Sequence, residues 1–320
     1  MKNLLVIGGS YFAGRVFVEL MAQSDRYRIH VFNRGHLRIG IPGVVQLTGD
    51  REIADQISDS IPDHHWDAVV DFCAYTPGAI DTLLDNLPGT VGHYIFISTT
   101  SVYAPTQNVP VTESAAKVDG PQPELGEFAE YGYQKWLAEC AAQKKCQSKN
   151  IAYTILRPSI IYGRYNYAPR ESFFFDHMIA NKPLVVPEDP NIFYSFVWVD
   201  DMAEMVAACL ENEAVQGQAF NIAGEEMISY IRMADTIEEV CGRKIERRPM
   251  SIEQIIRQRA PMPFPPDAHL LYDGRALNQT IGYEHTPFIL GIAKTWNDYQ
   301  RVVQRRIASQ QGRMKARSIA

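Results

Sequence analysis

The chain lacks the features that would place it in a membrane, outside the cell or on a nucleic acid. Its N-terminal apolar run is too short for a signal peptide, and no apolar stretch is long enough to span a bilayer. The net charge of −6 gives no general attraction to nucleic acid or to an anionic membrane. These absences predict a cytoplasmic protein that recognises a small molecule.

Cysteine is also scarce, with 5 residues that are widely spread and form no Cys-x-x-Cys pair. No histidine cluster accompanies them, so we predict reduced thiols, mostly in the core, and no metal site. What the chain has in quantity is ordinary globular composition, 46% hydrophobic and 21% charged, over 320 residues. That length holds two domains, or one large α/β domain with an inserted cap.

In the first half of the chain, short apolar runs alternate with helix-length segments. The runs have the composition of buried strands and lie at residues 4–7, 28–32, 44–47, 68–72, 94–98 and 153–156. Strands separated by helix-length segments predict βαβ units, and hence an α/β fold with a doubly wound parallel sheet. The later half is less regular, with further strands expected at 196–199 and 219–222 and a rigid proline-rich loop at 261–266.

The C-terminal tail, residues 301–320, is basic. It carries arginines and lysines without any acidic residue. We expect a solvated terminal helix that frays at its end. The alternative interpretation is a basic anchor for RNA.

A glycine-rich segment, residues 8–14 (GGSYFAG), follows a predicted strand and opens a predicted helix. Gly8 would permit a tight turn, Gly9 the close approach of the backbone to a pyrophosphate, and Gly14 close packing of helix on sheet. The helix N-terminus offers N–H groups to phosphates. The expected cofactor-binding residues of this turn are Gly8, Gly9, Ser10, Tyr11, Phe12 and Gly14. The alternative is a glycine-rich turn that binds no ligand.

The residues after the second predicted strand, Asn33 and Arg34, indicate which dinucleotide would bind. An acidic residue there would hold the ribose 2′-hydroxyl of NAD, but this chain has none, and Arg34 could pair with a 2′-phosphate. NADP is therefore favoured over NAD. In the competing interpretation Arg34 is solvated and Asn33 holds the NAD ribose. Asp50 and Arg51, after the third strand, are further expected cofactor contacts, although Asp50 could instead cap the next helix.

A tyrosine and a lysine four residues apart, Tyr131 and Lys135, share one face of a helix predicted over residues 131–147. A nearby ammonium favours the phenolate and lowers a tyrosine pKa from about 10 towards neutrality. Tyr131 is therefore the expected general acid/base, and Thr99 the expected hydroxyl partner of a substrate oxygen. A Tyr-x-x-x-Lys pair also arises by chance, so its meaning depends on the other motifs.

Taken together and in order, these motifs resemble the extended short-chain dehydrogenase/reductase family, the NAD(P)-dependent epimerases and dehydratases. The resemblance covers residues 1 to about 225. It is carried by the glycine turn, Asp50, residues 98–103 (STTSVY), Tyr131 with Lys135, Arg157-Pro158, residues 199–201 (VDD) and Phe220-Asn221. The glycine turn is also similar to atypical members, which include chloroplast stem-loop RNA-binding proteins and flavonoid-type reductases.

The resemblance implies a Rossmann sheet with a smaller C-terminal substrate domain. The NAD(P)-binding domain is expected at residues 1–163 and 191–224, and the substrate domain at 164–190 and 225–300, followed by the basic tail. The resemblance also implies a homodimer formed through the two helices that flank the active-site strand.

The implied chemistry is hydride transfer at a hydroxyl or carbonyl carbon of a sugar-like substrate, nucleotide sugars among them. The family's catalytic residues fall on Thr99, Tyr131 and Lys135. Tyr131 would take the hydroxyl proton, Lys135 would lower the tyrosine pKa and hold the nicotinamide ribose, and Thr99 would orient the oxygen. The sequence leaves open whether the enzyme is an epimerase, which returns the hydride, or a reductase.

The chain departs from the family pattern at two places. Thr100 and Ser101 stand where sugar-nucleotide dehydratases carry Asp-Glu, and Tyr194-Ser195 stands where epimerases have an arginine that grips the diphosphate. Arg164 or Arg170 could supply that charge. The alternative function is a non-catalytic cofactor-binding regulator or RNA-binding protein on the same fold, against which the retained catalytic residues and the acidic net charge both argue.

Overall fold

The computed structural model describes residues 1–317, and the side chains of residues 1–304. The chain forms two compact units. Unit 1 comprises Met1–Ile161, Ser195–Glu225 and Leu270–His285, and unit 2 comprises Tyr162–Tyr194, Glu226–His269 and the described residues from 286 on. Residues 270–285 thus belong to unit 1, whereas the sequence assigned them to the second domain. The cofactor and substrate roles of the two parts stay predictions.

Unit 1 is built on a seven-stranded sheet with the order β10-β6-β5-β4-β1-β2-β3, in which the strands pair in parallel. The predicted α/β fold with a doubly wound parallel sheet is confirmed. The strands are β1 (Lys2–Ile7), β2 (Tyr27–Asn33), β3 (Val44–Thr48), β4 (His64–Asp71), β5 (Gly89–Ile97), β6 (Ala152–Pro158) and β10 (Gln218–Ile222). Each expected strand of the first half is present, most of them longer than the sequence indicates.

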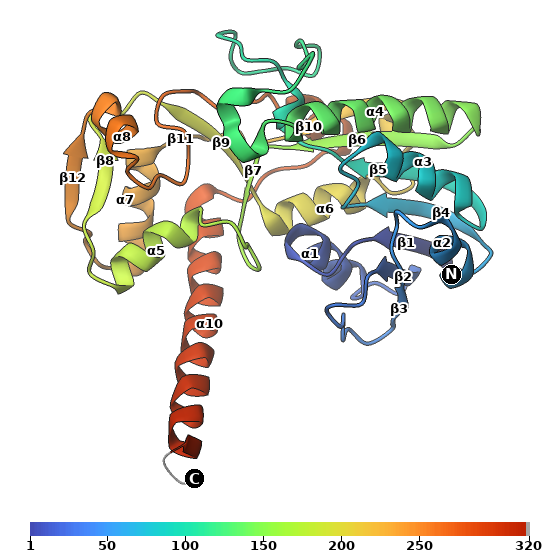
Figure 1. Cartoon of the computed structure of the whole chain (residues 1–320), viewed down its shortest axis with the longest axis horizontal. Coiled ribbons are helices and arrows are strands. Elements are labelled where there is room, and N and C mark those ends of the chain that lie inside the picture. Colours follow the sequence, from blue (N-terminus) through green and yellow to red (C-terminus); the bar gives the residue numbers. More distant parts are fainter. Residues whose placement is uncertain (318–320) are drawn as a thin grey trace. The chain divides into compact units, whose positions relative to one another are not determined.

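Helices cover both faces of this sheet (Figure 1). In β1, Leu4 packs into one hydrophobic cluster and Leu5 into another, because successive strand residues point to opposite faces. The first cluster includes residues of α1 (Phe12–Met21) and α6 (Val199–Cys209). The second includes residues of α2 (Ala54–Ser60), α3 (Pro77–Asn86) and α4 (Tyr131–Ser148). Unit 1 also holds α9 (Arg275–Ile281) and the 3-10 helices η1 (Thr100–Val102), η2 (Pro123–Phe128) and η3 (Glu213–Val215).

The strand register brings the expected site residues to one edge of the sheet. Ile7 is level with Phe32 of β2 and with Asp71 of β4, and Ile97 is level with Leu156 of β6. The chain order reverses beside β1, which pairs with β2 on one side and β4 on the other. In open parallel sheets, ligands bind beyond the carboxyl ends of the strands at such a reversal.

Unit 2 contains the parallel pair β8 (Leu184–Pro187) and β12 (Arg247–Met250). Its helices are α5 (Glu171–Ile179), α7 (Tyr230–Cys241), α8 (Ile252–Gln258) and α10 (Phe288–Arg317). The short strands β7 (Ile160–Tyr162), β9 (Phe193–Trp198) and β11 (Met227–Ser229) complete the chain. Residues 261–266 belong to no helix or strand, as the prolines predict.

The basic tail begins inside α10. The structure describes that helix to Arg317, but the side chains beyond residue 304 and the last three residues lie outside the described part of the chain. The expected fraying and the alternative RNA anchor therefore stay predictions. Within the described residues, none of the helices is both long and apolar enough to cross a membrane.

Candidate functional site

The glycine turn after β1 has a backbone that favours glycine at two successive positions. Gly8 has φ of +97° and Gly9 of +70°. A Cβ atom on Gly9 would lie 3.1 Å from methyl carbons of Val18 and Val31, so its side-chain direction faces the packed interior. The sequence predicts that Gly9 lets a pyrophosphate approach, and the structure adds that a side chain at this position would be crowded between the sheet and α1 and strained at this φ.

The N-terminus of α1 fits an anion. Its N-cap residue, Tyr11, makes no side-chain capping hydrogen bond, and the first turn contains no acidic residue. Phe12 opens the helix with φ of +37°, a strained value for a residue with a side chain. Gly14 holds the helix close to the turn, since a Cβ there would lie 3.0 Å from Cα of Gly9. Ser10 is buried and Tyr11 is exposed.

At the end of β2, the Asn33 side chain holds the following loop. Its Oδ1 accepts hydrogen bonds from the backbone N of Gly35 at 2.8 Å and from Nε2 of Gln46 at 3.0 Å. Arg34 is exposed, and no ion pair involves it within the described part of the chain. The end of β2 therefore presents an arginine to solvent and no carboxylate.

Asp50 and Arg51, which the sequence assigns to the cofactor, have different surroundings. Asp50 is half-buried, and its Oδ1 accepts from the backbone N of Glu52 at 3.0 Å. Arg51 is 8% exposed, and its guanidinium donates to Asp71 at 2.5 Å and to the carbonyl of Ala79 at 2.8 Å. Arg51 therefore makes its contacts with buried groups of the protein.

Asp71, the last residue of β4, is a fully buried carboxylate that sequence reasoning missed. It accepts from Arg51, from the hydroxyl of Tyr94 at 2.7 Å and from the backbone N of Cys73 at 3.0 Å. Burial by itself would raise the pKa of the Asp71 carboxyl, but the Arg51 guanidinium and these hydrogen bonds hold that pKa below its usual value. The sequence feature that could have identified Asp71 is an aspartate at the end of an apolar strand.

Lys135 lies at the centre of the site with a 2% exposed side chain. Its Nζ donates to the carbonyl of Ala74, after β4, and to that of Ile97, at the end of β5, both at 2.8 Å. It also lies 4.3 Å from the centre of the Phe96 ring. Burial lowers the pKa of the Lys135 ammonium to about 8, and the Asp71 and Glu139 carboxylates oppose that shift.

Thr99 directly precedes η1 and Tyr131 begins α4, and a close contact joins these two segments. Thr99 Oγ1 caps η1 by accepting from the backbone N of Ser101 at 3.1 Å. A Cβ atom on Gly132 would lie only 2.3 Å from the Ser101 carbonyl oxygen, so the first turn of α4 presses directly on the loop that carries Thr99. Tyr131, the first residue of α4, is 38% exposed. The sequence does not identify Gly132, whose role depends on a contact between distant segments.

Tyr194 and Ser195, where the chain departs from the family pattern, make their hydrogen bonds within the protein. Tyr194 is 1% exposed and its hydroxyl donates to the Pro265 carbonyl at 2.7 Å. Ser195 Oγ accepts from the backbone N of Tyr272 at 3.0 Å. These contacts hold the chain in place and offer no positive charge to a diphosphate.

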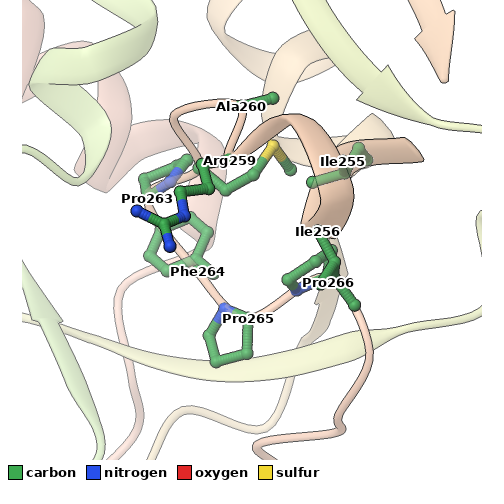
Figure 2. A pocket seen from close by; sticks show the side chains of 9 residues that line it. Ile255, Ile256, Arg259, Ala260, Pro263, Phe264, Pro265 and Pro266 are labelled. Carbon is green, nitrogen blue, oxygen red and sulfur yellow. The ribbon is translucent and has the colours of Figure 1, made fainter. Parts of the chain in front are cut away.

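Unit 2 contains a separate cleft with a volume of about 370 Å³ (Figure 2). It is lined by α8 and the proline-rich segment, with Ile255, Phe264 and Pro265 among its apolar residues and Arg259 as its charged residue. None of the predicted site residues lines this cleft. The candidate site is therefore the edge of the sheet in unit 1.

Comparison with known families and curated proteins finds a partial family match and two relatives. Residues 80–223 match the model of the NAD dependent epimerase/dehydratase family. A chloroplast stem-loop binding protein of 41 kDa from Arabidopsis thaliana is 27% identical over 255 residues, 75% of this chain and 64% of that protein. An uncharacterized UDP-glucose epimerase from Bacillus subtilis is 27% identical over 54% of this chain and 52% of its own length. The chain thus spans less than two thirds of either curated relative.

Solved structures share the fold at low identity. A UDP-glucuronic acid 4-epimerase from Bacillus cereus, in complex with UDP-glucuronic acid and NAD, has a TM-score of 0.72 and 17% identity, covering 94% of this chain and 99% of that one. A dTDP-glucose 4,6-dehydratase from Bacillus anthracis, in complex with NAD, has a TM-score of 0.72 and 18% identity, covering 94% and 97%. A UDP-glucose 4-epimerase from Thermotoga maritima has a TM-score of 0.74 at 16% identity, covering 94% and 99%.

Substitution of Gly132 tests the contact between α4 and η1. Gly132→Ala is expected to lower the free energy of unfolding by about 1–3 kcal/mol, because the new methyl group meets a backbone carbonyl that cannot turn away. The matched control is Gly78→Ala in α3, where the nearest atom to the new Cβ is 4.0 Å away, and its effect should stay below about 1 kcal/mol. Urea unfolding of both variants measures the difference. Equal effects would show that the close approach is absent.

Proposed function

We propose that the chain is a cytoplasmic enzyme of the NAD dependent epimerase/dehydratase family, whose model matches residues 80–223, and that it transfers hydride at a hydroxyl or carbonyl carbon of a sugar-like substrate. The observation that carries the proposal is the buried ammonium of Lys135. It lies at the carboxyl edge of the sheet, four residues after a solvent-accessible Tyr131 and beside the loop that carries Thr99. The family resemblance adds a homodimer.

The proposed chemistry follows from the three side chains. Tyr131, as the phenolate, takes the proton of the substrate hydroxyl, and its exposure lets a substrate reach it. Lys135 lowers the tyrosine pKa through its positive charge, which the two carbonyls of Ala74 and Ile97 hold in place. Thr99 orients the substrate oxygen, and its capping bond to Ser101 fixes the direction of its hydroxyl.

The glycine turn fits the cofactor that this chemistry requires. The uncapped N-terminus of α1 accepts the pyrophosphate, and no carboxylate in its first turn repels it. The nicotinamide supplies or accepts the hydride when it is bound. Arg34 favours NADP because it presents a guanidinium where NAD enzymes use a carboxylate. Asp50, which follows β3, contacts the adenine. Arg51 acts indirectly, by holding Asp71 in place.

The proposed substrate is sugar-like, with nucleotide sugars as one class. The Bacillus subtilis relative is named as a UDP-glucose epimerase, which favours that class. In contrast, Tyr194 and Ser195 make interior contacts and offer no positive charge, which favours a sugar substrate without a diphosphate. The proposal covers an epimerase, which retains its cofactor through turnover, and a reductase, which exchanges it.

RNA binding is the second candidate function, because one curated relative is named as a stem-loop binding protein. The net charge of −6 opposes it, since phosphate contacts need basic side chains. Binding of a stem-loop RNA that weakens steeply with salt would support this candidate, while undetectable binding at low salt would remove it.

Removal of the Tyr131 hydroxyl tests the catalytic proposal. Tyr131→Phe is expected to lower kcat at least about 100-fold, because the general base is lost while the aromatic ring remains. Affinity for NADP should stay within about threefold of the wild type. For UDP-glucose, chromatographic separation of the epimers gives the rate. For a panel of free sugars and their oxidised forms, the absorbance of reduced nicotinamide gives it, rising with the sugars and falling with the oxidised forms.

Tyr133→Phe is the matched control, since Tyr133 lies two residues further along α4 and is half-buried. It should retain wild-type kcat. Full activity of Tyr131→Phe on a substrate that the wild type converts would contradict the proposed role of the phenol.

Arg34 is expected to determine the choice of dinucleotide. Arg34→Ala should weaken NADP binding about tenfold and leave NAD binding unchanged, because only the 2′-phosphate meets the guanidinium. Arg28→Ala, an exposed arginine at the other end of β2, should leave both affinities unchanged. Titration calorimetry measures the four dissociation constants. If both Arg34→Ala and the wild type prefer NAD, Asn33 and not Arg34 governs recognition.

A further inference from the structure

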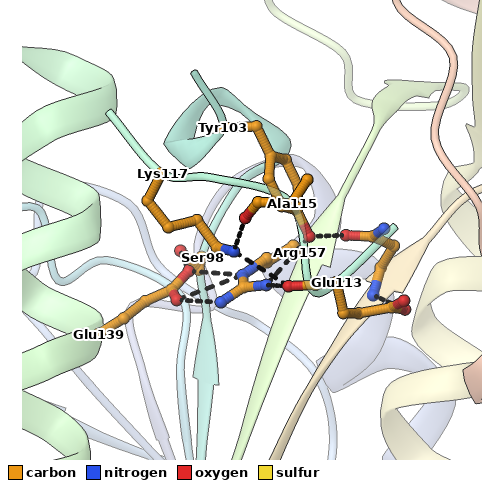
Figure 3. A network of polar contacts seen from close by, with 8 residues as sticks. Ser98, Tyr103, Glu113, Ala115, Lys117, Glu139 and Arg157 are labelled. Atoms are coloured by element: carbon orange, nitrogen blue, oxygen red, sulfur yellow. Dashed lines mark hydrogen bonds and ion pairs between the residues drawn. The ribbon is translucent and has the colours of Figure 1, made fainter. Parts of the chain in front are cut away.

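A buried ion pair joins Glu139 and Arg157 (Figure 3). Glu139 is fully buried in α4, and Arg157, near the end of β6, is 3% exposed. The guanidinium meets the carboxylate side-on, with Nε 3.0 Å from Oε1 and Nη2 2.6 Å from Oε2. The geometry is bidentate and fixes the relative orientation of the two groups.

Two hydroxyl groups extend this pair to the loop that carries Thr99. Ser98 Oγ donates to Glu139 at 2.5 Å, and Ser98 directly precedes Thr99. The Tyr103 hydroxyl, at the end of η1, accepts from Arg157 Nη1 at 3.0 Å and donates to Asn221 of β10 at 2.6 Å. Both ends of residues 98–103 are thereby attached to one charged pair.

The same pair also reaches the catalytic helix. Glu139 follows Lys135 by one turn of α4, so its carboxylate is rigidly related to both Lys135 and Tyr131. The network joins the carboxyl ends of β5, β6 and β10 to this helix. Stability alone explains it poorly, because a buried ion pair often contributes no more than apolar residues of similar volume.

We propose that Glu139, Arg157 and Ser98 are positioning residues that hold the Thr99 hydroxyl at a fixed distance from the Tyr131 phenol. This inference rests on the proposed function, in which both groups meet one substrate oxygen. Thr99 follows the end of β5 and Tyr131 begins α4, and the hydrogen bond from Ser98 to Glu139 connects these two elements in addition to the close contact at Gly132. A displacement of about 1 Å between such groups costs up to about 100-fold in rate.

Glu139 could instead act through its charge, since its carboxylate raises the pKa of the Lys135 ammonium against the effect of burial. The two roles separate in variants that keep the charge. Glu139→Asp retains the carboxylate but shortens it by one methylene, and Ser98→Ala removes one neutral hydroxyl. Positioning predicts a lower kcat for both variants, whereas an effect of charge alone predicts wild-type kcat because the charge is retained. The pH profile should stay unchanged in either case.

The test compares these variants with matched controls in unit 2. Ser229→Ala removes a buried hydroxyl that caps α7, and Glu238→Asp shortens a buried carboxylate paired with Arg247. Using UDP-glucose and the sugar panel on NADP-loaded protein, we expect kcat to fall about tenfold for Ser98→Ala and for Glu139→Asp. The KM, the NADP dissociation constant and the pH profile should stay unchanged, and both controls should keep wild-type kcat.

Amide hydrogen exchange of the NADP-loaded proteins gives a second readout that needs no substrate. Exchange at residues 98–103 should quicken in Ser98→Ala and Glu139→Asp and stay unchanged in the two controls. Wild-type kcat in Ser98→Ala and Glu139→Asp, or unaltered exchange at residues 98–103, would overturn the inference. If the wild type converts no substrate in the panel and Tyr131→Phe matches it, the proposed function fails, while the exchange experiment still decides whether the network holds the loop.

Discussion

The site depends on a single buried ammonium. Lys135 is withdrawn from water, and its charge is stabilised by two backbone carbonyls at the ends of adjacent strands, Ala74 after β4 and Ile97 in β5. Removing an ammonium from water is unfavourable in free energy, and this burial lowers the pKa of Lys135 to about 8. A lysine that remains charged at neutral pH but lies out of water exerts its field on neighbouring groups with little screening.

Two buried carboxylates keep that charge in place. Asp71, held by Arg51, ends β4, and Glu139, held by Arg157, lies one turn beyond Lys135 in α4. Each carboxylate is paired with an arginine, so neither takes the lysine as its ion-pair partner. The lysine charge is therefore balanced at a distance, and its Nζ donates to the two backbone carbonyls.

The sequence predicts the parts of this arrangement that depend on local pattern. The strands, the glycine turn and the Tyr131/Lys135 spacing are visible because periodicity and short motifs lie within a few residues of each other. The interior role of Arg51 and the need for glycine at position 132 are not visible, because each depends on a contact across the fold, with Asp71 in one case and with Ser101 in the other. The same limit applies to Tyr194, whose partner Pro265 lies 71 residues away.

The described contacts of Lys135 lie within one of the two units of the chain. Ala74, Ile97, Asp71 and Glu139 all belong to unit 1. Tyr194, at the position where the family pattern fails, and its partner Pro265 belong to unit 2. Because the described contacts of the ammonium all lie in unit 1, substitutions in unit 2 can alter its own contacts without altering the surroundings of Lys135. Tyr194 and Ser195 carry no positive charge while the surroundings of Lys135 stay intact, which fits the general rule that one fold carries many different sites.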